Sequence, residues 1–177
     1  MNWKITEKTL LKSRFFKLKE QKIAKGNVER KQEIIERKPF SMIFPLNENR
    51  VIYLISQYRT LYDKVILEAV AGHLDDGESS LVAAKRELEE EAGLIAGQWE
   101  EILKIETSGS VIRSRAHFFL AREIEQVDAH PEEDEEITVI KMSFSEAIKK
   151  IESGEITNGP TITGLLFLDK LIREKKL

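Results

Sequence analysis

Hydrophobic and polar residues follow one another in patterns that predict both strands and helices. Short runs rich in β-branched and aromatic residues are typical of strands. Such runs occur at Phe15–Ile23, Val28–Ile35, Met42–Leu46, Val51–Gln57, Lys64–Val70, Glu101–Ile105, Ala116–Arg122 and Ile137–Met142. Because strands are mixed with helices, the pattern favours an α/β (α+β) fold in which helices cover a sheet.

Three segments are predicted to be helices. In Ser79–Ala92 the apolar residues recur every three or four positions and form one stripe, and Gly93 follows where a helix commonly ends. Ser143 and Glu146 have capping-box spacing ahead of a second helix, which we expect to end near Gly154. A third helix is expected over 161–175, after a proline.

The first 38 residues are predicted to form a separate, highly charged appendage. Its two expected strands flank Gly26-Asn27, a pair that favours a tight turn, so we expect a β-hairpin. A lone hairpin is only marginally stable in water. We therefore expect residues 1–38 to pack on the main domain, residues 39–177, or on a second subunit.

Composition narrows the class of protein. The chain has 177 residues, 41% of them hydrophobic, and a formal net charge of −3. It has no cysteine, which excludes disulfides, thiolate nucleophiles and cysteine-ligated zinc. No apolar run is long enough to span a bilayer, the start does not resemble a secretory signal, and the balanced charge is a poor match for nucleic acid. We expect a cytoplasmic protein with neither membrane nor nucleic-acid partners.

Three acids in the central helix indicate a metal site. Glu87, Glu90 and Glu91 stand at i, i+3 and i+4, so they share an arc of about 100°. Like charges at this spacing cost a helix roughly 0.2–0.5 kcal/mol per pair. Lys85 and Arg86 can offset part of this repulsion, and a divalent cation would offset more. The alternative is a solvated acidic face.

The residues around these acids resemble the Nudix box. The match comprises Gly72, Glu78, Arg86, Glu87, Leu88, Glu90, Glu91, Gly93 and Leu94. The resemblance implies a Nudix-type α/β/α sandwich with a mixed sheet, and Mg²⁺- or Mn²⁺-dependent hydrolysis of nucleoside diphosphates linked to another moiety. It also implies that Glu87, Glu91 and the carbonyl of Ala71 are metal ligands, and that Glu90 is either a ligand or a residue that organises the metals. Glu78 and Arg86 would brace the loop and helix.

Outside the box the chain resembles ADP-ribose pyrophosphatases and related nucleoside-diphosphate-sugar hydrolases. The resemblance rests on Val51–Arg59 and Leu67–Gly72. It implies a homodimer built by the amino-terminal segment and a nucleotide-sugar substrate. Arg59 would contact the pyrophosphate, and Glu68 would bind substrate or a second cation; a strand-end charge and a solvated rim acid are the alternatives.

Departures from that group leave the preferred sugar open. Thr107-Ser108-Gly109 replaces a proline-containing turn, Val70 replaces a proline, and the acid expected before His117 is missing. Arg113 and Arg115 lie near that gap, and we expect one of them to meet the phosphates.

The resemblance places the catalytic base in the acidic loop of residues 127–136. Glu133 aligns best with the base and Glu135 with an additional metal ligand, while Glu132 and Glu136 stay open. Glu90 is the next candidate for the base.

The same residues leave three alternative functions. They are a Nudix hydrolase of dinucleotide polyphosphates or nucleoside triphosphates, a non-catalytic nucleotide-sugar sensor, and a calcium-binding module at Asp75-Asp76-Gly77. The last loop lacks the alternating ligands of an EF-hand.

Overall fold

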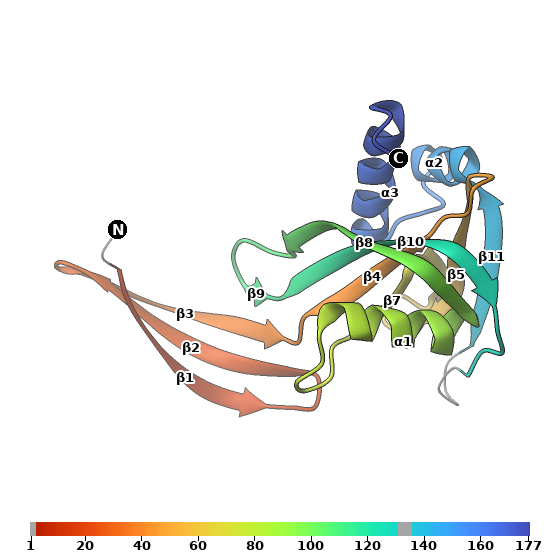
Figure 1. Ribbon diagram of the computed structural model, residues 1–177. Helices are drawn as coiled ribbons and strands as arrows, with labels where there is room; N and C mark the ends of the chain where they lie inside the picture. The colour runs from red at the N-terminus through yellow and green to blue at the C-terminus, as the bar shows by residue number, and fades with distance from the viewer. Residues whose placement is uncertain (1–2, 131–135) are drawn as a thin grey trace. The chain divides into compact units, whose positions relative to one another are not determined.

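The computed structural model describes residues 3–130 and 136–177. The chain forms two compact units (Figure 1). Unit 1 comprises Met1–Pro39 and Ile105–Ala116, and unit 2 comprises Phe40–Lys104 and His117–Leu177. The amino-terminal segment predicted to be an appendage thus shares its unit with a second segment from the middle of the chain.

Unit 1 is a sheet with the strand order β1-β2-β3-β9. Its strands are β1 (Lys4–Lys12), β2 (Phe16–Lys25), β3 (Val28–Arg37) and β9 (Ile112–Arg113). The predicted hairpin is confirmed as β2 and β3, with Gly26 at φ 58° in the turn between them. β1 pairs antiparallel with β2, and β9 pairs parallel with β3, so the sheet is larger than a hairpin.

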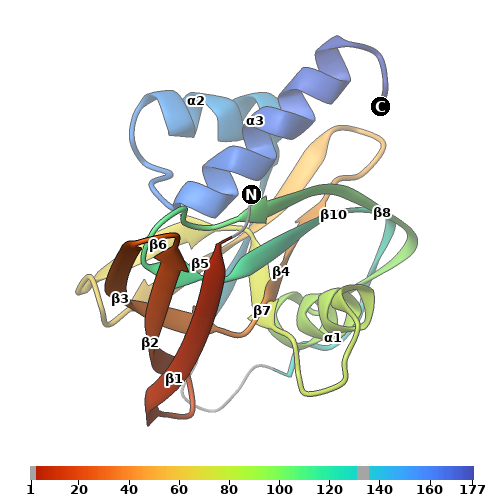
Figure 2. The same ribbon diagram turned by 90° about the vertical axis from the view of Figure 1, so that its left-hand side faces the viewer.

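Unit 2 contains two further sheets, with strand orders β7-β4-β10-β8 and β11-β5-β6. The strands are β4 (Phe40–Pro45), β5 (Val51–Arg59), β6 (Lys64–Glu68), β7 (Val70–His73), β8 (Leu94–Glu106), β10 (Arg115–Gln126) and β11 (Ile137–Ser143). The last residues of β8 and the first residues of β10 belong to unit 1. Helix α1 (Ser80–Ala92) lies on one side of these sheets, and α2 (Phe144–Glu152) and α3 (Gly159–Arg173) lie on the other (Figure 2). This layering confirms the predicted α/β/α sandwich.

The core of unit 2 lies between α1 and the strands. Ile43, Ile55, Val70, Leu88 and Leu94 are fully buried there. On the other side, Gly164 of α3 packs so closely on Phe44 that an added Cβ would lie 2.0 Å from the ring. The apolar stripe predicted for the central helix is therefore what attaches it to the sheet.

One predicted strand is in fact two. The run Lys64–Val70 breaks at Ala69: β6 before it pairs with β5, and β7 after it pairs with β4. The N–H of Ala69 leaves the strand ladder because the hydroxyl of Thr161 accepts it at 3.0 Å. The chain thus passes from one sheet to the other at a single residue.

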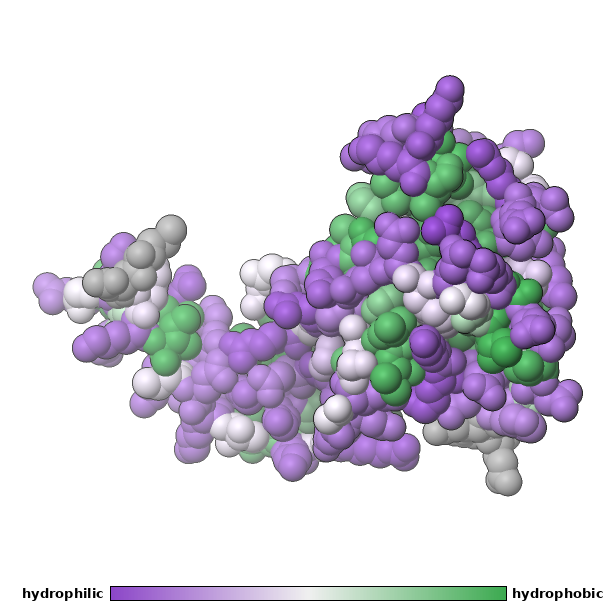
Figure 3. All heavy atoms as spheres, in the orientation of Figure 1, coloured by the Kyte–Doolittle hydropathy of each residue, from purple (hydrophilic) through white to green (hydrophobic). Residues whose placement is uncertain are grey.

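The surface is mostly hydrophilic in the view of Figure 3, with separate apolar areas rather than one continuous patch. In unit 1 every residue of β1 is exposed, including Ile5, Leu10 and Leu11. Among the described residues, no helix combines the length and the apolar character that a bilayer crossing requires.

Candidate active site

Helix α1 is fixed at both ends by local sequence. The Ser79 side chain caps its first turn by accepting the N–H of Val82 at 3.3 Å. Gly93 ends it in the left-handed conformation, φ 58° and ψ 41°, and an added Cβ would lie 2.8 Å from the carbonyl oxygen of Val127. Glycine is needed here for both reasons. With its ends set and Leu88 buried, the helix directs Glu87 and Glu91 toward β7.

Glu91 is buried against the strand that precedes the box. The residue is 7% exposed, and its Oε2 accepts the N–H of Ala71 at 3.2 Å. An acid at this depth is rare unless it is paired or coordinates a metal. The predicted ligands Glu91 and Ala71 are therefore neighbours.

Glu87 lies over Gly72. A Cβ at position 72 would stand 1.8 Å from Cδ and Oε1 of Glu87, so the two residues touch only because glycine has no side chain. Gly72, one of the residues that match the Nudix box, thus lets the Glu87 carboxylate lie against the backbone of β7.

Arg86 binds the acids on either side of it. Its Nη1 donates to Glu87 at 2.8 Å and to Glu90 at 2.9 Å, and its Nη2 donates to Glu78 at 3.1 Å and to the carbonyl of His73 at 3.2 Å. The guanidinium holds the pKa of the Glu78 carboxyl below its usual value. The same acids raise the pKa of Arg86, so it stays charged. An ion pair therefore joins Arg86 to Glu78, and their predicted role in bracing the loop and helix stays a prediction.

The first residues of the acidic loop, which spans 127–136, lie beside the carboxyl end of α1. The N–H of Val127 donates to the carbonyl of Gly93 at 2.8 Å, and the N–H of His130 donates to the carbonyl of Glu90 at 3.0 Å. Glu136 is exposed and precedes β11. Glu132, Glu133 and Glu135 lie outside the described residues, so their predicted roles stay predictions.

The donors fit a hard divalent cation in type. Glu87, Glu90 and Glu91 supply carboxylate oxygens beside the backbone of Ala71, and such oxygens suit Mg²⁺ and Mn²⁺. Within residues 3–130 and 136–177, however, no three acidic or histidine side chains are close enough together to form a metal site. Glu90 is turned toward Arg86 and its side chain is 45% exposed.

Arg59 and Glu68 bind each other. Nε and Nη2 of Arg59 both lie 2.6 Å from Oε1 of Glu68, and the amide of Asn158 donates to Oε2 at 2.9 Å. Burial raises the pKa of the Glu68 carboxyl, and Arg59 opposes that rise. The side chain of Glu68 is 5% exposed, whereas that of Arg59 is 37% exposed. Arg59 is therefore anchored at one side and open at the other.

The two arginines near the missing acid belong to unit 1. Arg113 pairs with Glu7 at 2.5 Å and with Glu36 at 3.1 Å. Arg115 pairs with Glu106 at 2.5 Å. Both side chains are about half exposed, at 47% and 55%. Their predicted contact with phosphates stays a prediction.

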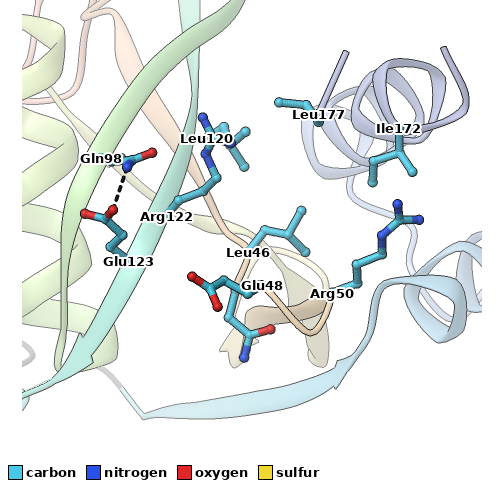
Figure 4. Close-up of a pocket in the computed structure, with 10 residues that line it drawn as sticks. Leu46, Glu48, Arg50, Gln98, Leu120, Arg122, Glu123, Ile172 and Leu177 are labelled. Carbon is cyan, nitrogen blue, oxygen red and sulfur yellow. Dashed lines mark hydrogen bonds between the residues drawn. The ribbon is translucent and has the colours of Figure 1, made fainter. Parts of the chain in front are cut away.

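A cavity of about 330 Å³ lies in unit 2, between α3 and the sheet (Figure 4). It is lined by Leu46, Asn47, Glu48, Arg50, Gln98, Leu120, Arg122, Glu123, Ile172 and Leu177. These residues come from the β4–β5 turn, from β8 and β10, and from α3 and the carboxyl terminus, and the lining includes none of the box residues.

Two polar residues of the site region were missed by sequence reasoning. Asn158 caps α3 by accepting the N–H of Thr161 at 2.9 Å, and Thr161 is fully buried beside Ala69. The available signal was an asparagine two residues before a proline, which is a common helix start.

Comparison with known proteins agrees with this geometry. The model of the NUDIX domain matches residues 36–162. The ADP-ribose pyrophosphatase of Bacillus subtilis (strain 168) is 29% identical over 172 residues, 93% of each chain. A methanol dehydrogenase activator of Bacillus methanolicus is 31% identical, over 92% of each chain.

Two further matches extend the comparison. The GDP-mannose pyrophosphatase of Cronobacter sakazakii (strain ATCC BAA-894) is 32% identical over 76% of this chain and 75% of its own. A crystal structure of an ADP compounds hydrolase superposes with a TM-score of 0.84 at 20% identity, covering 99% of this chain and 96% of that one, and so shares the fold. The family model covers most of the chain, and it includes α1, whose Glu87 and Glu91 lie against β7. The chain belongs to the Nudix family of pyrophosphohydrolases.

Proposed function

We propose that this chain hydrolyses the diphosphate bond of nucleoside diphosphate sugars, including ADP-ribose, to a nucleoside monophosphate and a sugar phosphate. The observation that carries the proposal is the packing of Glu91 and Glu87 on the backbone of Ala71 and Gly72. Relatives named ADP-ribose pyrophosphatase and GDP-mannose pyrophosphatase give the substrate class and leave the sugar open.

Mg²⁺, with Mn²⁺ as a substitute, is the proposed cofactor. Glu87, Glu91, Glu90, Glu135 and the carbonyl of Ala71 would hold it. When bound, such an ion neutralises charge on the diphosphate and lowers the pKa of a water molecule.

The side chains of the protein would do the remaining work. Glu133 is proposed to take the proton from the attacking water, since a carboxylate within hydrogen-bond reach can act as a general base; Glu90 is the alternative. The anchoring of the acidic loop at Glu90 supports this, because the loop starts beside the acids of α1. Arg59, held by Glu68 and open at its other side, would orient the phosphates. Arg113 and Arg115 are proposed to add positive charge at the substrate.

Residues 1–38 and 39–177 are proposed as the appendage and the catalytic domain of a cytoplasmic homodimer. The exposed apolar residues of β1 support the dimer, because β1 is at the edge of its sheet and offers unpaired backbone groups.

A substrate panel tests the function. ADP-ribose, GDP-mannose, a dinucleotide polyphosphate and a nucleoside triphosphate would each be incubated with the purified chain, with and without Mg²⁺. We expect Mg²⁺-dependent release of AMP and ribose 5-phosphate from ADP-ribose, or of the matching products from GDP-mannose. Faster turnover of the triphosphate with release of pyrophosphate would contradict the proposal, and so would turnover without a divalent cation.

A further inference from the structure

Thr161 lies where the chain passes from one sheet of unit 2 to the other. Its hydroxyl accepts the N–H of Ala69 at 3.0 Å and donates to Oδ1 of Asn158 at 2.9 Å, and the residue has no exposed surface. The hydroxyl therefore acts both as an acceptor and as a donor inside the protein. Ala69 is itself 1% exposed, so its N–H has this hydroxyl as a partner in a place away from water.

The hydrogen bonds continue from Asn158 to the surface. The amide of Asn158 donates to Oε2 of Glu68, and Oε1 of Glu68 accepts from Arg59. We call Thr161, Asn158, Glu68 and Arg59 the Thr161 network. It connects the first turn of α3 to the last residue of β6 and the last residue of β5.

This network fixes the strand that carries the box backbone. β7 begins at Val70, directly after Ala69, the residue that Thr161 binds. The N–H of Ala71, the next residue of β7, donates to Glu91. Gly72 then lies under the Glu87 carboxylate. Side chains therefore bind the backbone N–H groups on both sides of Val70: Thr161 of α3 binds Ala69, and Glu91 of α1 binds Ala71.

We propose that Thr161 is a positioning residue: by holding Ala69 out of the strand ladder, it sets the place of the Ala71–Gly72 backbone opposite Glu91 and Glu87. The inference rests on the proposed function for its link to metal-dependent hydrolysis. Its structural part, the placement of Ala71 by Thr161, can be measured without a substrate. Groups that orient ligands typically change metal affinity by about 10- to 100-fold when they are lost.

The test compares Thr161→Val, which has nearly the same shape and lacks the hydroxyl, with Thr161→Ser, which keeps it. Thr163→Val is the matched control, because the Thr163 hydroxyl donates to the carbonyl of Gly159 in the same helix, whereas the N–H of Ala69 donates to Thr161. Amide hydrogen exchange at Ala69 and Ala71, the dissociation constant for Mn²⁺, and the Mg²⁺ dependence of hydrolysis would be measured for each variant.

We expect Thr161→Val to speed exchange at Ala69 and Ala71 by about tenfold, as the loss of one hydrogen bond implies. Mn²⁺ affinity should fall by at least about tenfold. At saturating Mg²⁺ the KM for the nucleotide should stay near the wild-type value. Thr161→Ser should restore both exchange and metal affinity, and Thr163→Val should change neither.

A folded Thr161→Val protein with wild-type exchange at Ala71 and wild-type Mn²⁺ affinity would overturn the inference, as would a wild-type chain that binds no Mn²⁺. If Thr161→Val does not fold, Asn158→Ser carries the test, since serine still caps α3 but cannot donate to Glu68 as the amide does. It should shift exchange and affinity in the same direction, and wild-type values would again overturn the inference. A wild-type chain that binds Mn²⁺ but hydrolyses no diphosphate would instead refute the proposed function alone.

Discussion

Position 72 accommodates a hydrogen atom and nothing larger, because the Glu87 carboxylate occupies the place of a side chain. The group that would have to move is the far end of a flexible side chain rather than backbone. We therefore expect Gly72 to determine the position of the Glu87 carboxylate and to contribute little to the free energy of unfolding.

Gly72→Ala should consequently separate activity from folding. We expect the carboxylate of Glu87 to be displaced, and kcat/KM to fall by at least about tenfold, the smaller loss seen when ligand orientation fails. The melting temperature should change by less than about 3 °C, because only a side-chain end moves. Steady-state kinetics and calorimetry check both. If the melting temperature falls by much more than about 3 °C and kcat/KM falls only as far as the loss of folded protein explains, Gly72 acts on stability and not on the position of Glu87.

Glu91→Gln changes the charge at the most buried acid of the box. The glutamine oxygen can still accept the N–H of Ala71, so the fold should remain. Loss of a group that orients a metal ligand typically lowers metal affinity or activity by about 10- to 100-fold. Glu91 is a proposed ligand itself, so we expect Glu91→Gln to lower kcat/KM by at least about 100-fold. Wild-type turnover by the folded variant would refute the assignment.

The spacing of the acids was enough to predict these residues but not their contacts. Glu87, Glu90 and Glu91 could be placed on one arc because helix periodicity is local. That Glu90 turns to Arg86 while Glu91 is buried against Ala71 depends on the docking of α1 on β7, which has no local signature.

At the scale of elements, unit 1 contains a charged cross-strand cluster. Glu7 of β1 and Glu36 of β3 share Lys19 of β2 and Arg113 of β9. The hydrogen bond from Arg113 is the largest cause that lowers the pKa of the Glu7 carboxyl, to about 2. The pKa of Glu36 is also lowered, chiefly by Lys19.

A lowered carboxyl pKa makes unit 1 sensitive to acid. The stabilisation is complete above the unfolded pKa, 4.5, and is lost as the pH falls from 4.5 toward about 2, because the unfolded chain takes up the proton first. Glu7→Gln should lower the melting temperature by about 2–4 °C at pH 7. Melting curves of both proteins between pH 7 and pH 2 should converge, and a gap that stays constant with pH would contradict the assignment.

Helices and strands could be predicted where the apolar residues repeat at a regular spacing. They could not be predicted where a contact with a residue distant in sequence shapes the backbone. α1 and its end at Gly93 followed from periodicity and from one glycine. The break at Ala69 did not, because Lys64–Val70 is strand-like throughout and Ala69 donates to Thr161, a residue far along the chain. β1 was missed because its exposed residues show no apolar face.

At the scale of the whole molecule, the exposed side chains of β1 bear on the proposed homodimer. β1 exposes Ile5 and Leu11 to solvent, at 55% and 50%. In a homodimer built by the amino-terminal strands, these side chains would be buried against the partner.

Ile5→Lys and Leu11→Lys should therefore weaken assembly. Each loses about 1.5–3 kcal/mol of apolar burial, so the dimer dissociation constant should rise by about tenfold or more. Sedimentation would distinguish the 20.4 kDa monomer from a dimer. Leu61→Lys is the control, since Leu61 is 83% exposed in unit 2. A wild-type chain that sediments as a monomer at micromolar concentration would contradict the proposed dimer.

Arg86 gives one positive charge to three carboxylates, those of Glu78, Glu87 and Glu90, and Glu91 adds a fourth negative charge nearby. Among these five groups negative charge exceeds positive charge, which is unfavourable to a bare nucleotide. For the proposed Mg²⁺ or Mn²⁺, this imbalance would favour entry before the nucleotide or together with it. Because ions in solution screen such a potential over about 10 Å at 0.1 M, ionic strength should govern how quickly the first partner arrives.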